Sequence, residues 1–125
     1  MIKVLLIIGT GGFVGSISRY LAQQLIQERF DSSFPLGTMV VNIIGSFIIG
    51  IVYALSEKGD ILSPEWRLFL AVGLCGGFTT FSSFAYENFQ MMKMEQFVFV
   101  ALYMGLSLFL GILATYLGVI SIKLI

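Results

Sequence analysis

Four long apolar stretches, separated by short polar segments, make up most of this 125-residue chain. Each is long enough, at about 1.5 Å of rise per helical residue, to cross roughly 30 Å of hydrocarbon. Hydrophobic residues are 58% of the chain and charged residues only 11%, whereas soluble domains carry about 25% charged residues. The sequence therefore predicts an all-α polytopic membrane protein with a single four-helix transmembrane domain over residues 1–125. The expected spans are residues 4–27, 36–56, 64–92 and 97–122.

Charge and cysteine content exclude several classes of function. Seven Lys and Arg residues balance seven Asp and Glu residues, so we expect no nucleic-acid partner. The single cysteine, Cys75, cannot form a disulfide within one chain, and the chain has no histidine for a zinc site. The sequence contains no nucleophile and base pair, so we do not expect an enzyme. We expect the protein to be surrounded by the lipid bilayer.

The third span contains a run, Gly76 to Ser83, that resists a continuous helix. Glycine costs about 1 kcal/mol relative to alanine in a helix interior, and Thr and Ser side chains compete for backbone hydrogen bonds. Broken backbone at membrane depth is tolerated only where protein buries it or water reaches it. We therefore expect the third helix to be broken near its middle and the break to line an interface or a pathway.

Small and polar side chains form a stripe along one face of each of the other three spans. Such a stripe can simply pack helices together, but three stripes beside a broken helix favour a polar track. Asn42 is the most polar group near the middle of the second span. Its amide forms either an interhelical hydrogen bond, worth about 0.6 kcal/mol on average in membranes, or part of this track.

Two charged residues lie inside the predicted spans. Arg19 sits about two turns from the end of the first span, where an unpaired charge is costly. It either snorkels to the membrane interface, lines a polar vestibule or caps another helix end. Glu87 lies late in the third span, where it can bind a hydroxyl or Arg19.

Phe81 and Phe84 are three residues apart, so both rings leave the same side of the resumed third helix, beside Thr80 and Ser83. Aromatic residues usually serve packing. Ring edges carry partial positive charge, however, and can also face an anion.

The distribution of basic residues specifies orientation only weakly. Four spans place both termini on one side of the membrane, and that side carries four basic residues against two on the other, which is a weak positive-inside bias. One explanation is dual topology, in which two copies insert in opposite directions and pair antiparallel. We therefore expect at least a dimer. The basic residues are Lys3, Lys58, Arg67 and Lys123 on one side, Arg29 and Lys93 on the other, with Arg19 inside a span.

Three motifs resemble the signatures of the CrcB/Fluc fluoride channels, and the similarity covers essentially the whole chain. They are GGFVGSISRY at 11–20, GTMVVNIIGSF at 37–47 and GLCGGFTTFSSFAYE at 73–87. The resemblance implies a fluoride-selective channel that exports fluoride through two pores of an antiparallel homodimer in the inner (plasma) membrane. It also implies a central structural sodium ion.

By motif position, the resemblance assigns roles to individual residues. Backbone carbonyls of Gly76 and Thr79 would hold the sodium ion. Arg19, Thr38 and Glu87 would form the vestibule and its polar support. The fluoride pore would be lined by Asn42, Thr80, Phe81, Ser83, Phe84, Tyr103 and Ser107.

Two other functions fit a small four-span protein. A dual-topology, proton-coupled exporter of drugs or cations generally needs a carboxylate deep in the bundle, and Glu87 is the only acid well inside a span. A membrane scaffold subunit would use the polar stripes only to pack helices.

Overall fold

The computed structural model describes residues 1–59 and 61–125, and it is helical over most of that range. Four helical segments in this range are long and apolar enough to cross a membrane, which confirms the predicted all-α, four-span class. Each segment begins within two residues of its predicted start. In chain order the elements are α1 (Ile2–Arg29), α2 (Leu36–Glu57), α3 (Pro64–Arg67), the π-helix η1 (Leu68–Cys75), α4 (Gly76–Phe78), α5 (Phe81–Lys93) and α6 (Phe97–Lys123).

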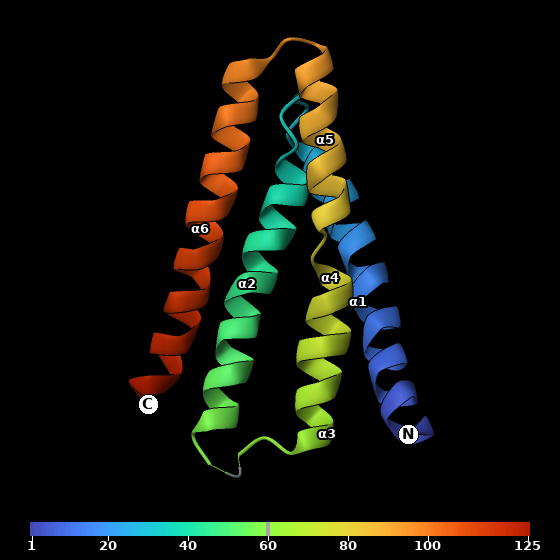
Figure 1. Cartoon of the computed structure of the whole chain (residues 1–125), viewed down its shortest axis with the longest axis vertical. Helices are drawn as coiled ribbons and strands as arrows, with labels where there is room; N and C mark the ends of the chain where they lie inside the picture. Colours follow the sequence, from blue (N-terminus) through green and yellow to red (C-terminus); the bar gives the residue numbers. More distant parts are fainter. Residues whose placement is uncertain (60) are drawn as a thin grey trace.

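The spans lie side by side, and both chain termini lie at the same end of the bundle (Figure 1). The first and last helices, α1 and α6, form its two edges in this view, with α2 and the third span between them. Packing is most extensive between α2 and α6, and between α1 and the η1–α4 segment.

Glycines allow α1 and the third span to approach to backbone contact. A Cβ atom added at Gly73 would lie 2.8 Å from the carbonyl oxygen of Ile8 and 2.9 Å from the Cα of Gly11. Neither backbone atom can move aside alone, so this crossing requires glycine. It anchors the first half of the third span firmly against α1.

The third span is not a uniform α-helix. After the short α3, η1 is a π-helix over eight residues, which nothing in the sequence had indicated. Gly76 remains helical (φ −61°, ψ −38°), and α4 ends at Phe78. Thr79 (φ −93°, ψ 158°) and Thr80 (φ −149°, ψ 119°) are extended, and α5 begins directly after them. The non-helical segment is thus shorter than the run from Gly76 to Ser83.

Thr80 explains why the helix resumes so soon. Its side-chain oxygen accepts a hydrogen bond from the backbone N–H of Ser83 at 3.1 Å, which makes Thr80 the N-cap of α5. A threonine in extended conformation is well suited to this position, because its hydroxyl satisfies one of the unpaired N–H groups of the first turn.

Candidate functional site

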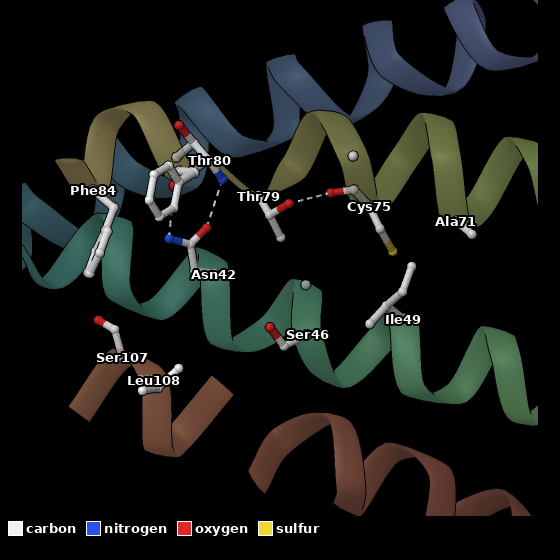
Figure 2. A pocket seen from close by; sticks show the side chains of 13 residues that line it. Asn42, Ser46, Ile49, Ala71, Cys75, Thr79, Thr80, Phe84, Ser107 and Leu108 are labelled. Carbon is white, nitrogen blue, oxygen red and sulfur yellow. Dashed lines mark hydrogen bonds between the residues drawn. The ribbon is translucent and has the colours of Figure 1, made fainter. Parts of the chain in front are cut away.

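A groove of about 450 Å³ lies beside Thr79 and Thr80, bordered by α2, the third span and α6 (Figure 2). Among the described residues that line it, none carries a charge. The polar atoms of its largely apolar lining therefore come from hydroxyl, amide and backbone groups alone. Its lining includes these residues singled out from the sequence: Asn42, Gly76, Thr79, Thr80, Phe81, Phe84 and Ser107.

Asn42 binds both backbone polar groups of Thr80. Its Nδ2 donates to the Thr80 carbonyl oxygen at 3.1 Å, and the Thr80 N–H donates to its Oδ1 at 2.8 Å (Figure 2). In a continuous α-helix that N–H would donate to the carbonyl of Gly76. Asn42 thus supplies the acceptor that the Thr80 N–H loses. The amide keeps one further Nδ2 hydrogen for another acceptor.

Arg19 caps a helix end, which was one of the alternatives for this residue. Its Nε donates to the carbonyl oxygen of Gly77 at 3.0 Å, and its Nη1 donates to Gln23 Oε1 at 3.3 Å. Carbonyls at a helix C-terminus carry partial negative charge, so a half-buried guanidinium is stabilised there. Arg19 and Asn42 therefore hold the two sides of the extended segment.

A chain of hydrogen bonds continues from Arg19 across the bundle. Gln23 Nε2 donates to Thr38 Oγ1 at 2.9 Å, and Thr38 Oγ1 donates to Glu87 Oε2 at 2.7 Å. The Tyr103 hydroxyl donates to the other carboxylate oxygen, Oε1, at 2.7 Å. The prediction that Glu87 binds a hydroxyl is confirmed. Side chains of all four spans take part in this network.

Two aromatic rings and a hydroxyl lie at the groove itself. Phe84 is half-buried, with its ring centroid 4.9 Å from that of Tyr103 and 5.8 Å from that of Phe81. Phe81 is 79% exposed, so its ring lies at the open side. Ser107 Oγ is buried at the groove and has no hydrogen-bond partner among the described residues.

Some of the predicted site residues do not line the groove. Tyr103 is fully buried and donates its hydroxyl to Glu87, so it belongs with Arg19 and Thr38 in the hydrogen-bonded network and does not line the groove. Ser83 is also absent from the lining, and its backbone N–H binds Thr80.

Two polar side chains at the site were not selected as site residues from the sequence. Gln23 lies one turn after Arg19 on the polar face of the first span, and it joins Arg19 to Thr38. Ser46 lies one turn after Asn42 and lines the groove. Position on a polar stripe was the available signal for both, but a stripe does not distinguish these residues from its other members.

Comparison with known proteins identifies the relatives of this chain. The family model described as "CrcB-like protein, Camphor Resistance (CrcB)" matches residues 6–119. A Gloeothece citriformis protein is 48% identical over 98% of both chains. A Leptospira interrogans protein is 46% identical over 97% of this chain and 95% of its own length. A Flavobacterium psychrophilum protein is 42% identical over 97% of this chain and 98% of its own.

All three relatives are named "Fluoride-specific ion channel FluC", which describes a transport protein and not an enzyme. The family match covers most of the chain, and it confirms the resemblance carried by the motifs at 11–20, 37–47 and 73–87. This chain belongs to the CrcB family.

Proposed function

We propose that this protein is a fluoride-selective ion channel that exports fluoride across the cell's inner (plasma) membrane. The observation that carries the proposal is identity of 42 to 48% to relatives named as fluoride-specific ion channels, over at least 97% of this chain. Local structure alone would not name the ion.

The chemistry of the groove supports an anion pathway. A small, strongly hydrated anion must exchange its water for other donors as it passes. The unpartnered hydroxyl of Ser107, the spare Nδ2 hydrogen of Asn42 and the ring edges of Phe81 and Phe84 can supply them. Because the described lining contains no fixed cation, binding remains weak enough for release.

The width of the groove supports a second copy of the chain as its other wall. The groove of about 450 Å³ is much larger than the space that one water needs, so one chain does not force an ion to lose its hydration. Phe81, at the open side, is largely exposed. Together with the weak charge bias, this favours an antiparallel, dual-topology homodimer with two pores.

A structural sodium ion fits the backbone of the extended segment. The N–H groups that would bind the carbonyls of Gly76 and Thr79 in a continuous helix are those of Thr80 and Ser83. They donate instead to Asn42 and to the Thr80 hydroxyl. A Cβ at Gly76 would meet nothing within 4 Å, so space is open beside it. Sodium would neutralise such carbonyl ends at the dimer centre.

In this proposal Arg19, Thr38, Glu87 and Tyr103 support the pathway rather than line it. Arg19 and Glu87 are the two charged residues among these four, and hydrogen bonds within the bundle hold both side chains. Ser83 contributes through its backbone N–H, which donates to the Thr80 side chain that caps α5.

Fluoride efflux from liposomes tests the proposal. Vesicles containing the purified protein and loaded with fluoride should release it when a potassium ionophore supplies an electrical shunt, and chloride-loaded vesicles should not release chloride. Fluoride release no faster than from protein-free vesicles would reject the proposal, and would favour the scaffold function.

Proton-coupled export is the second candidate, because Glu87 is a carboxylate inside a span. Glu87→Gln keeps the size of the side chain and its ability to accept from Tyr103. A channel should still release fluoride clearly faster than protein-free vesicles, although the variant loses the acceptor for Thr38, and the flux should not require a proton gradient. Complete loss of transport with an intact dimer would favour the exporter.

A further inference from the structure

We propose that Gln23 is a positioning residue for conduction: it fixes the direction in which the Thr38 hydroxyl donates, so that Thr38 always donates to Glu87. This inference rests on the proposed fluoride channel function. It concerns a side chain that does not line the groove and that acts through other residues.

The orientation of the Gln23 amide follows from its contact with Arg19. A guanidinium has only donors, so the atom of Gln23 that faces Arg19 Nη1 must be the oxygen. The amide nitrogen then faces Thr38 Oγ1 at 2.9 Å. Arg19 thus determines that Gln23 donates to Thr38.

The direction of the next hydrogen bond follows in the same way. A hydroxyl has a single proton, and Thr38 Oγ1 already accepts from Gln23. Its own proton is therefore directed to Glu87 Oε2, 2.7 Å away. Thr38 is only 3% exposed, so water does not compete for it.

The consequence is that both carboxylate oxygens of Glu87 accept from buried hydroxyls, those of Thr38 and Tyr103. Their dipoles offset the negative charge and hold it in one place. The Tyr103 ring contacts Phe84, whose own ring lines the groove. A Glu87 with one donor could rotate, displace this aromatic pair and repel an anion in the groove.

Gln23→Glu inverts the hydrogen-bond direction at nearly constant shape. A carboxylate only accepts, so Arg19 would remain bound while Thr38 would donate to position 23 and leave Glu87. We expect fluoride flux to fall about tenfold or more, which is the factor that corresponds to losing a hydrogen bond to a charged group. The midpoint of thermal unfolding should change little, because Arg19 gains an ionic partner while Glu87 loses one donor.

Gln23→Met separates positioning from packing. It removes the amide at similar length but leaves Thr38 free to donate to Glu87, so flux should fall much less than in Gln23→Glu. Gln24→Glu introduces the same charge at the exposed neighbouring position and should conduct as the unmodified protein does. In a Thr38→Val background, Gln23→Glu should cause little further loss.

The outcomes distinguish this inference from the proposed function. If the unmodified protein releases fluoride and Gln23→Glu matches Gln24→Glu, the inference is wrong while the channel function stands. Equal losses in Gln23→Met and Gln23→Glu would show a packing role and overturn it too. If Gln23→Glu does not fold, Gln23→Met must still conduct clearly better than Thr38→Val. An unmodified protein without fluoride release would reject both.

Discussion

Asn42→Leu removes the side chain that binds the extended part of the third span. The substitution keeps the approximate volume but eliminates both hydrogen bonds to Thr80, of 3.1 Å and 2.8 Å. At about 1 kcal/mol for each bond, we expect the folded state to lose about 2 kcal/mol. Asn42 and Thr80 are half-buried beside the groove, so water can partly replace the amide and keeps the cost at this level.

The effect on transport follows from the position of Thr80 at the groove. If the whole 2 kcal/mol acts on the conducting conformation, fluoride flux falls by up to about 30-fold, since 1.4 kcal/mol corresponds to tenfold. Hydrogen–deuterium exchange should also accelerate at the Thr80 amide, because its N–H loses its acceptor. Liposome efflux, thermal unfolding and exchange together measure the three consequences.

Two further variants control this experiment. Ser46→Ala removes a hydroxyl that lines the same groove one turn away, and should leave exchange at Thr80 unchanged. Asn42→Asp keeps the acceptor for the Thr80 N–H but turns an oxygen toward the Thr80 carbonyl and adds negative charge. Its flux should be lower than that of Asn42→Leu. An Asn42→Leu protein with normal flux, stability and exchange would refute the reasoning.

Two substitutions test other contacts. Gly73→Ala should destabilise the protein by about 1 to 3 kcal/mol in thermal unfolding, because its Cβ would meet backbone atoms of α1, including the Ile8 carbonyl at 2.8 Å. The matched variant Gly105→Ala meets nothing within 4 Å and should be neutral or slightly stabilising; equal effects at the two sites would contradict the packing argument. Phe81→Ile should lower fluoride flux severalfold without dissociating the dimer, since it removes a ring edge from the groove, and unchanged flux would exclude that role.

The spans could be predicted from sequence because their determinants are local. Length and apolarity define a membrane helix, and a cap such as Ser63 before Pro64 has a recognisable pattern. The Ser63 side chain accepts a hydrogen bond from the N–H of Trp66 at 3.3 Å. The π-helix has no comparable signal, because helix propensities do not encode the shift from i+4 to i+5 hydrogen bonds.

Partners of the polar residues could not be predicted from the same patterns. A stripe places Asn42 on a helix face but does not say which residue of another span it meets, and Thr80 is 38 positions away. Tyr103 shows the same limit: it lies on the polar stripe of the fourth span, yet its hydroxyl binds Glu87 and not the groove. Gln23 was overlooked because its importance arises from two neighbours on different spans.

The way Arg19 and Glu87 are joined explains how a membrane bundle can contain charges and still keep its groove neutral. A direct ion pair would bring the two side chains to one place. Gln23 and Thr38 instead keep Arg19 at the Gly77 carbonyl and Glu87 beside Tyr103, while hydrogen bonds in a single direction join them. Each charge is therefore compensated where it lies. In the proposed channel, a passing anion would meet neutral donors, which would bind it weakly and release it.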